Sequence, residues 1–155
     1  KRPDYLLVAS DAAGPTFRHN QFPEYKGTRS EMPADLVPQI PLVRQLLELA
    51  DVPCLELPGY EADDILATIA RQTAEAGGDC VLVTSDKDAR QLLGPRVRLL
   101  NLRNNTMLGE AELRQDWGIG PEQVVDYLAL VGDVVDNVPG VPGIGPKIAS
   151  SLLQE

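Results

Sequence analysis

The sequence predicts an α/β domain in which a mostly parallel central sheet is flanked by helices. Short apolar runs alternate along the chain with segments of helical periodicity, and Gly or Pro residues separate them. Acidic residues follow several of the apolar runs, at the ends where strands of an open parallel sheet place their ligands. A chain of 155 residues, 43% hydrophobic and 24% charged, is long enough to bury one core.

The candidate strands are four apolar runs, at residues 5–9, 52–57, 80–83 and 97–102. Helical spacing of apolar residues marks the segments between and after them. We expect helices in the later part of residues 36–50, over residues 61–76, in a short segment ending at residue 93, and over residues 110–117, 121–131 and 146 onward. Pro38 and Pro41 restrict the first helix, Gly77 ends the second, and Pro121 and Pro146 suit first helical positions.

Both ends of the sequence suggest a piece of a longer chain, truncated on each side. It begins with Lys1, and its last helical pattern reaches Glu155 without a cap. Cys54 and Cys80 lie in separate apolar runs without metal-ligand spacing, so we expect two buried free thiols in a reducing compartment. The run at residues 5–9 is too short for a signal peptide or a membrane span, which predicts a soluble protein with no membrane partner.

Carboxylates recur after candidate strands, at one helix start and in one loop. The set is Asp11, Glu61, Asp63, Asp64, Asp86, Asp88, Asp133 and Asp136. For residues 61–64 alone, capping of free N–H groups at the helix start is the simpler interpretation. Repetition along the chain favours convergence on cations instead, because so many carboxylates at one sheet edge would repel one another. Oxygen ligands without a Cys/His cluster indicate Mg²⁺ or Mn²⁺ rather than zinc.

The net charge of −9, from 14 basic and 23 acidic side chains, argues on its face against a nucleic-acid partner. If cations neutralise the acidic set, however, local basic patches decide binding. Residues 17–29 interleave basic and aromatic side chains, which suits phosphates and bases, although a solvated loop is the plainer alternative. For His19 we expect a surface or hydrogen-bonded role rather than metal ligation.

Residues 132–147 form a glycine-rich segment that lacks the spacing of a Walker loop. Its glycines free backbone N–H groups just before the helix expected from Pro146, which would suit a phosphate. A plain turn between two helices explains the same residues equally well.

In order and spacing, these motifs resemble the 5′-to-3′ exonuclease domain of bacterial DNA polymerase I, within the flap endonuclease superfamily. The resemblance runs through residues 11–19, 22–29, 59–64, 84–88, 126–133 and 136–145. It implies a PIN-like nuclease core over residues 1–131, with a partial helical arch at about residues 15–40. It also implies a truncated helix–three-turn–helix DNA-binding module over residues 132–155, of the kind that often holds K⁺.

The resemblance also implies roles for particular residues. Two Mg²⁺ or Mn²⁺ ions would be held by the eight carboxylates, with Asp11, Glu61, Asp63 and Asp64 at the first site and Asp86, Asp88, Asp133 and Asp136 at the second. Lys26 and Arg29 would be catalytic cations that meet the scissile phosphate. The residues expected to bind DNA are Arg18, Tyr25, Gly140, Gly143, Gly145 and Lys147.

The sequence departs from the family pattern at several points. The family places another metal-binding aspartate on a strand that would precede Lys1. Val134 and Val135 replace a pair that is usually small and polar, and Pro146 and Ile148 replace polar residues common at the start of the DNA-gripping helix.

The expected function is therefore a structure-selective 5′-3′ exonuclease and 5′-flap endonuclease that hydrolyses DNA with two metal ions. We expect it to act in primer removal and repair, as a monomer linked covalently to a polymerase domain, in the bacterial cytoplasm near the nucleoid. One alternative is a DNA-binding module of the same family without catalysis. Another is an unrelated phosphatase or phosphoacceptor domain, which would share the acidic pocket but not the glycine-rich segment.

Overall fold

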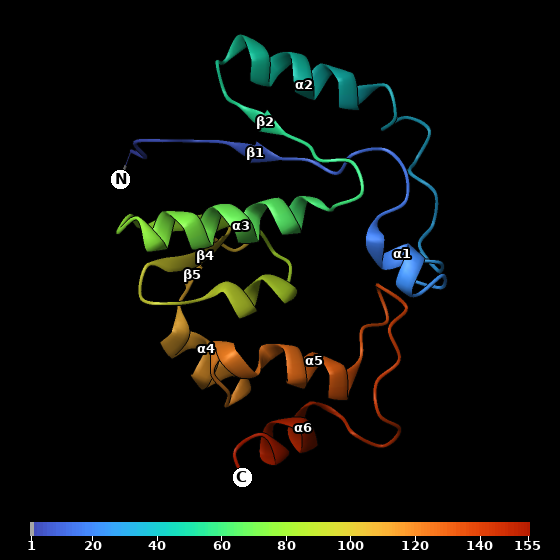
Figure 1. Ribbon diagram of the computed structural model, residues 1–155, viewed down its shortest axis with the longest axis vertical. Coiled ribbons are helices and arrows are strands. Elements are labelled where there is room, and N and C mark those ends of the chain that lie inside the picture. Colours follow the sequence, from blue (N-terminus) through green and yellow to red (C-terminus); the bar gives the residue numbers. More distant parts are fainter. Residues whose placement is uncertain (1) are drawn as a thin grey trace. The chain divides into compact units, whose positions relative to one another are not determined.

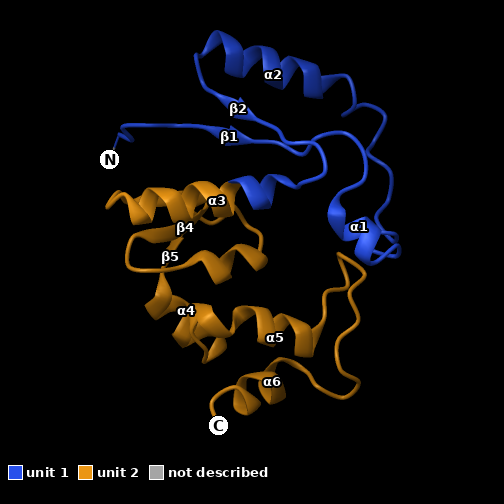
Figure 2. Ribbon diagram, in the orientation of Figure 1, with its two compact units in different colours: residues 1–65 blue, residues 66–155 orange. Residues whose placement is uncertain are grey.

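The structure is a computed structural model that describes residues 2–155 (Figure 1). The chain divides into two compact units, one up to Ile65 and one from Leu66 to Glu155, called unit 1 and unit 2 here (Figure 2). Helix α3 (Ala62–Glu75) spans the division, so its first residues belong to unit 1 and the rest to unit 2. Among the described residues, every helix is too short or too polar to cross a bilayer.

Unit 1 contains short strands and helices before α3 begins. They are β1 (Val8–Ala9), α1 (Phe17–Gln21), α2 (Gln39–Leu49) and β2 (Cys54–Leu55). β1 and β2 pair in parallel, with Val8 opposite Cys54. Both strands are shorter than the apolar runs that predicted them, since Pro53 has no N–H to extend the ladder. Helix α2 occupies the later part of its predicted segment, and Pro41 falls in its first turn, where the missing N–H costs little.

Unit 2 holds the remaining elements. After α3 come β3 (Cys80–Val83), the 3₁₀ helix η1 (Asp88–Leu92), β4 (Val97–Asn101), β5 (Thr106–Leu108), α4 (Glu110–Trp117), the 3₁₀ helix η2 (Pro121–Gln123), α5 (Val124–Val131) and α6 (Pro146–Leu152). The predicted bounds of β3 and α4 are confirmed. α4 ends at Gly118, whose left-handed φ of 71° suits glycine.

The α/β class is confirmed, but the expectation of one mostly parallel central sheet is wrong for the described residues. Their strands form two small sheets, β1–β2 and β3–β4–β5. β3 and β4 are parallel, whereas β5 returns antiparallel to β4 after a tight turn in which Asn105 has a φ of 53°. β5 has only three residues, which is too few for a sequence pattern to predict a strand. The pairing of strands depends on which backbone edges meet in the folded chain.

The apolar core of unit 2 holds the segments that carry its acidic residues. Leu113, Ile119 and Val124 are its largest fully buried side chains. Ala89 in η1 and Leu93 directly after it are buried in the same core. η1 and α5 are therefore both anchored in one packed interior.

The two cysteines are more exposed than predicted. Cys54 is exposed and Cys80 is half-buried, so the expectation of two buried thiols is wrong for Cys54. The reason is that β2 is a two-residue strand whose side chains are both exposed among the described residues. Burial raises the pKa of the Cys80 thiol.

Candidate functional site

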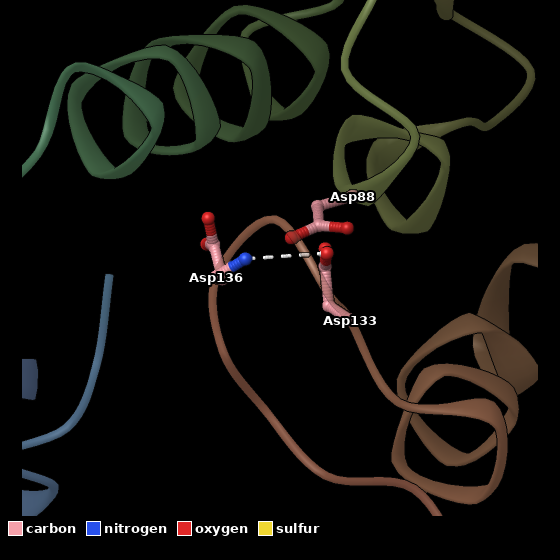
Figure 3. Close-up of side chains that lie close together, drawn as sticks. All are labelled: Asp88, Asp133 and Asp136. Carbon is pink, nitrogen blue, oxygen red and sulfur yellow. Dashed lines mark hydrogen bonds between the residues drawn. The ribbon is translucent and has the colours of Figure 1, made fainter. Parts of the chain in front are cut away.

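Three aspartates gather in unit 2. Asp88, Asp133 and Asp136 each offer a carboxylate oxygen, and these oxygens all lie within 4.8 Å of one another (Figure 3). Asp88 is the first residue of η1, while Asp133 and Asp136 lie in the loop between α5 and α6. Three carboxylate oxygens at this separation could contact one hard cation.

The loop that carries Asp133 and Asp136 is closed by its own hydrogen bonds. Asp133 Oδ1 accepts the N–H groups of Val135, at 2.8 Å, and of Asp136, at 3.3 Å. The backbones of Asp133 and Val138 exchange two hydrogen bonds, of 2.8 and 2.7 Å. These bonds turn Asp133 and Asp136 toward the same region, as Figure 3 shows.

Glycine is required where the two ends of this loop meet. Gly132 has a φ of 78°, and a Cβ placed on it would lie 2.3 Å from the Gly140 nitrogen. A Cβ on Gly140 would lie 2.4 Å from the Val131 carbonyl carbon. A side chain at either position would push the backbones apart and open the loop.

Asp88 is the member of the cluster that has a buried oxygen, Oδ1, without a hydrogen-bond partner among the described residues. Burial, together with the charges of Asp86, Asp133 and Asp136 and against the opposing effect of Lys87, raises the pKa of Asp88 to about 6. A carboxylate in this setting gains from a nearby cation, because a buried charge without a partner is costly.

Asp133 stays ionised more readily than Asp88. Lys87 Nζ lies 3.2 Å from Asp133 Oδ2. Burial alone would raise the pKa of Asp133, but hydrogen bonds from the Val135 N–H, from Lys87 and from the Asp136 N–H outweigh burial and lower that pKa. Neighbouring carboxylates with pKa values moved in opposite directions are typical of functional sites.

Asp86 supports this cluster from the turn after β3. Its Oδ1 accepts the Asp88 N–H at 2.9 Å, and its own N–H donates to Thr84 Oγ1 at 3.0 Å. Three of the four carboxylates predicted for the second site thus come together, and Asp86 orients the backbone of one of them. All three gathered groups are oxygen donors, and one holds a buried atom without a partner, so the set fits a hard divalent cation.

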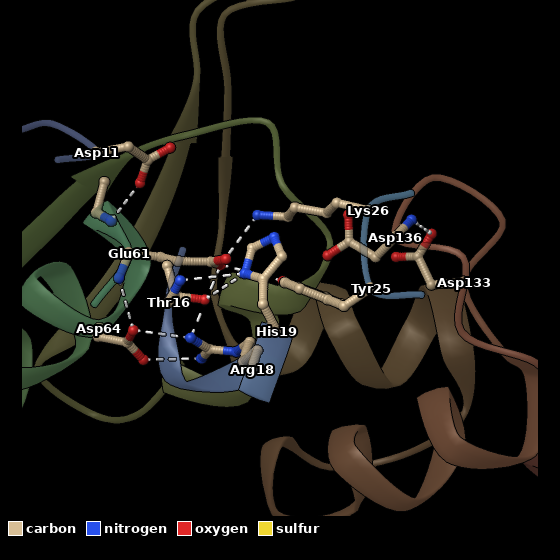
Figure 4. Close-up of polar contacts among 11 residues, drawn as sticks. Asp11, Thr16, Arg18, His19, Tyr25, Lys26, Glu61, Asp64, Asp133 and Asp136 are labelled. Carbon is tan, nitrogen blue, oxygen red and sulfur yellow. Dashed lines mark hydrogen bonds and ion pairs between the residues drawn. The ribbon is translucent and has the colours of Figure 1, made fainter. Parts of the chain in front are cut away.

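In unit 1, the predicted ligands surround the start of α3 (Figure 4). Asp11 Oδ1 accepts the Ala62 N–H at 2.6 Å, and Asp64 Oδ2 accepts the Glu61 N–H at 2.9 Å. The capping role that was the simpler interpretation of this acidic turn is therefore present. Asp63 lies beside them in the first turn of α3.

Basic side chains already meet two of these carboxylates. Arg18 makes a bidentate contact with Asp64 through two bonds of 2.8 Å, which lowers the pKa of Asp64 and raises that of Arg18. Lys26 Nζ lies 3.0 Å from Glu61 Oε2, and the Tyr25 hydroxyl donates to the same oxygen at 3.1 Å. Glu61 is only 5% exposed, so its charge depends on these partners.

The short segment around α1 carries Arg18, and Lys26 follows it. His19 Nδ1 accepts the Thr16 N–H at 3.1 Å, which caps α1, and its ring meets the Tyr25 ring edge-on at 5.3 Å. The expectation that His19 is hydrogen bonded is confirmed. Lys26 has a φ of 57°, an uncommon conformation for a residue other than glycine. Its ion pair with Glu61 helps to offset that cost.

The remaining predicted residues lie on turns. The Arg29 N–H donates to the Lys26 carbonyl at 3.0 Å, one turn further along. Gly143 has a φ of 83°, and Gly145 directly precedes α6, which carries Lys147. The polar groups of Arg18 and Tyr25 meet carboxylates in unit 1. The DNA contacts of all these residues stay predictions.

Sequence reasoning overlooked Lys87, which joins η1 to the Asp133 loop. Its position between two predicted metal ligands was the signal that could have revealed it. It also overlooked the hydrogen bond between Tyr25 and Glu61, for which the sequence offers no signal because the two residues are 36 positions apart.

Two family models match the chain end to end. The model described as the N-terminal resolvase-like domain of 5′-3′ exonuclease matches residues 1–118. The model described as the C-terminal SAM fold of 5′-3′ exonuclease matches residues 119–155.

The curated relatives are named for polymerase and exonuclease. The chain is 44% identical over 153 residues to DNA polymerase I of Rhizobium leguminosarum, covering 99% of this chain and 15% of that protein. It is 41% identical over 155 residues to the 5′-3′ exonuclease of Aquifex aeolicus, covering 100% of this chain and 54% of that protein.

A solved structure shares the fold. It is the bacteriophage T5 flap endonuclease in a pseudo-enzyme-product complex with DNA and metal ions, with a TM-score of 0.83 and 25% identity. The match covers 97% of this chain and 60% of that one. The chain thus spans less than two thirds of the length of each of these proteins.

Proposed function

We propose that this chain, which belongs to the 5′-3′ exonuclease family, carries the nuclease site of a structure-selective 5′-3′ exonuclease and 5′-flap endonuclease that hydrolyses DNA. The observation that carries the proposal is the gathering of Asp88, Asp133 and Asp136, with one buried carboxylate oxygen that lacks a partner. The names of the relatives, and the DNA and metal ions in the T5 complex, support it.

Divalent cations are the proposed cofactors. Asp88, Asp133 and Asp136, backed by Asp86, would hold one Mg²⁺ or Mn²⁺ ion. A second ion would be held by Asp11, Glu61, Asp63 and Asp64. When bound, such ions activate the attacking water and stabilise the leaving oxygen of a phosphodiester. Oxygen-only ligands and the raised pKa of Asp88, which burial produces, support this assignment.

The chain's own cations are proposed to handle the phosphate. Lys26 and Arg29 would stabilise the negative charge that develops on the scissile phosphate. In the structure, Lys26 is paired with Glu61 at 3.0 Å. A phosphate near Lys26 would compete with Glu61 for the same ammonium group, and Tyr25 would continue to donate its hydrogen bond to Glu61. Arg18 keeps Asp64 ionised through their bidentate contact, and the first ion would compete with Arg18 for these two oxygens.

DNA binding outside the reacting phosphate is proposed for two segments. Residues 132–155 would form the helix–three-turn–helix module, in which Gly140, Gly143, Gly145 and Lys147 meet backbone phosphates without reading sequence, with K⁺ as a further ligand. Residues 15–40 would form part of a helical arch on a PIN-like core of residues 1–131. Arg18 and Tyr25 are the further DNA contacts proposed there.

The relatives named DNA polymerase I support a proposal for the biological setting. We infer that the site works in primer removal and repair, in a monomer linked to a polymerase domain, in the bacterial cytoplasm near the nucleoid. A preference for flapped, nicked or branched duplex is part of this proposal, as is Mg²⁺ as the metal used in the cell.

One observation favours a second candidate, a DNA-binding module without catalysis. Glu61 and Asp64, two proposed ligands of the first ion, are engaged by Lys26 and Arg18. If these ion pairs persist in the presence of metal, the first ion cannot bind these carboxylates, and the chain would hold DNA without cutting it.

A cleavage assay separates the two candidates. The complete natural chain that contains residues 1–155 is incubated with a labelled 5′-flap duplex, with and without Mg²⁺. We expect Mg²⁺-dependent cutting, its loss in Asp88→Asn, and DNA binding that survives the substitution. Asp79→Asn is the matched control, because Asp79 is an exposed acid of the same unit that pairs with Arg96 at 3.2 Å. Binding without cutting by the unsubstituted chain would favour the second candidate.

A further inference from the structure

Arg90 links the acidic cluster of unit 2 to an aromatic stack. Its guanidinium carbon lies 4.2 Å from the centroid of the Trp117 ring. Its Nη1 atom lies 2.6 Å from Asp116 Oδ2. The Trp117 ring also stacks on Tyr127, with ring centroids 4.5 Å apart and an interplanar angle of 22°. Arg90, Trp117 and Tyr127 are called the Arg90 stack below.

The Arg90 stack joins the two segments that bring the aspartates together. Arg90 lies on η1, two positions after Asp88. Tyr127 lies on α5, and the loop that carries Asp133 begins directly after that helix. Trp117, the last residue of α4, stands between them. The separation of Asp88 from Asp133 therefore depends on how η1 is held against α5, and the Arg90 stack connects these elements through α4.

η1 needs contacts of this kind to hold its orientation. It is a 3₁₀ helix of five residues, a form with poor hydrogen-bond geometry. The Arg90 N–H donates to Lys87 O at 3.1 Å, and the Leu93 N–H donates to Arg90 O at 3.3 Å. Ala89 and Leu93 bury one side of the segment in the core. Apolar burial does not fix the orientation of a segment. The contact of a planar guanidinium with a ring face and a carboxylate is directional.

We propose that Arg90 is a positioning residue for the metal cluster: by stacking on Trp117, which is backed by Tyr127, it holds η1 so that Asp88 stays within ligating distance of Asp133 and Asp136. The identity of the cluster as a metal site rests on the proposed function. Arg90 touches neither substrate nor metal in this account, and its charge is already compensated by Asp116. Its effect on the cluster is therefore geometric.

The contact with Asp133 made by Lys87 is a different kind of link. Lys87 meets a proposed ligand directly, at 3.2 Å, so its removal would change both charge and geometry. Arg90 offers a cleaner test, because Arg90→Lys keeps the positive charge and the reach to Asp116 but loses the planar group that stacks on Trp117.

The test measures Mn²⁺ binding to the complete natural chain by isothermal calorimetry, with the electron paramagnetic resonance signal of free Mn²⁺ as a second readout. Loss of a group that orients a metal ligand typically weakens metal binding by roughly 10- to 100-fold. We expect Arg90→Ala to weaken Mn²⁺ binding by about tenfold and Arg90→Lys by several-fold. We expect Asp116→Asn, which keeps the stack, to change Mn²⁺ binding by less than about twofold. Arg96→Ala is the matched control, since it removes an exposed ion pair with Asp79 in the same unit.

A readout that a purely structural role would not change is the metal dependence of cleavage. In Arg90→Ala, saturating metal should restore most of kcat on a 5′-flap duplex, while the metal concentration at half-maximal rate rises about tenfold. Assays run well below the melting temperature of each variant, and Arg90→Lys replaces Arg90→Ala if the latter does not fold.

The two proposals fail in distinguishable ways. If the unsubstituted chain binds no Mn²⁺, the metal cluster itself is wrong and the inference falls with it. If the unsubstituted chain binds Mn²⁺ and the folded Arg90 variants bind it equally well, only the positioning role of Arg90 is overturned. The same holds if Arg96→Ala weakens binding as much as Arg90→Ala does.

Discussion

At the scale of single residues, Asp88 and Asp133 share one cluster, but their pKa values are shifted in opposite directions. Burial, together with the neighbouring carboxylates, raises the pKa of Asp88 to about 6, whereas hydrogen bonds, acting against burial, lower the pKa of Asp133. The difference lies in their partners: Asp133 accepts backbone N–H groups and meets Lys87, while Asp88 keeps a buried oxygen without a partner among the described residues. Asp88 is thus the residue whose charge most needs a cation.

This difference predicts the pH dependence of stability without metal. Because its folded-state pKa is raised, Asp88 contributes stability that is present below its unfolded pKa and is lost as pH rises from about 4 to about 6. Above pH 7 in a chelator, Asp88→Asn should be more stable than the natural chain by about 1 kcal/mol, discounted for partial exposure. Thermal unfolding at pH 4 and pH 7.5 measures this, and the gain should shrink at the lower pH.

Added metal should reverse that order. Millimolar Mg²⁺ should raise the melting temperature of the natural chain by mass action on the folded state and should raise that of Asp88→Asn much less. Asp79→Asn, an exposed substitution in the same unit, should respond to Mg²⁺ as the natural chain does. Equal shifts in all three proteins would contradict a metal site at Asp88.

Lys26 provides a second prediction at this scale. Lys26→Met leaves the buried Glu61 charge without its ammonium partner, which should cost about 3 kcal/mol of folding free energy. Lys26→Met combined with Glu61→Gln should recover much of that loss, because no charge remains unpaired. Urea unfolding of the two single variants and the double variant gives the coupling energy. Cleavage below the unfolding range should stay slow in the double variant, since it lacks both the proposed phosphate contact of Lys26 and the carboxylate that Glu61 would offer to the first ion.

At the scale of elements, the loop between α5 and α6 depends on close backbone approach. Gly140→Ala should destabilise unit 2 by about 2 kcal/mol or more, since its Cβ would lie 2.4 Å from a backbone carbon. Metal binding should weaken with it, because this loop carries Asp133 and Asp136. Gly94→Ala is the control, as a Cβ there meets nothing within 4 Å and its stability should change by less than about 0.5 kcal/mol. Equal unfolding midpoints would show that the loop tolerates a side chain.

At the scale of the whole molecule, the charge of −9 opposes DNA binding. Binding should therefore strengthen with a divalent cation and show a shallow slope against log salt, since few phosphates are engaged. Lys147→Ala should reduce that slope by about one and weaken flapped and unflapped duplexes alike. Arg71→Ala, on an exposed part of α3 where Arg71 pairs with Glu75, should leave the slope unchanged. Fluorescence anisotropy at several salt concentrations measures the affinity and the salt slope of each variant.

The domain boundary predicted after residue 131 stays a prediction. The structure divides the chain at residue 65, within α3, whereas the family models divide it at residue 118. These divisions describe compactness and ancestry, and neither measures whether residues 132–155 bind DNA as a module. The PIN-like core and the helical arch likewise remain proposals.

The sequence by itself determined what is local or periodic. Helical spacing placed α3 and α4, a short apolar run placed β3, and the order of acidic and glycine-rich motifs pointed to the 5′-3′ exonuclease family that the comparisons confirm. Cap residues and glycines set the ends of helices through short-range sterics and hydrogen bonds, which a sequence displays directly.

Only the tertiary structure decided which distant groups meet. The sequence grouped Asp86 with Asp88, Asp133 and Asp136. The fold brings the last three together, whereas Asp86 accepts a hydrogen bond from the Asp88 backbone N–H. The pairing of β5 with β4 and the contact of Arg90 with Trp117 likewise join segments that the sequence does not relate. These contacts depend on how elements pack and on which oxygens lose water in doing so. Neither packing nor desolvation is a property of one stretch of chain.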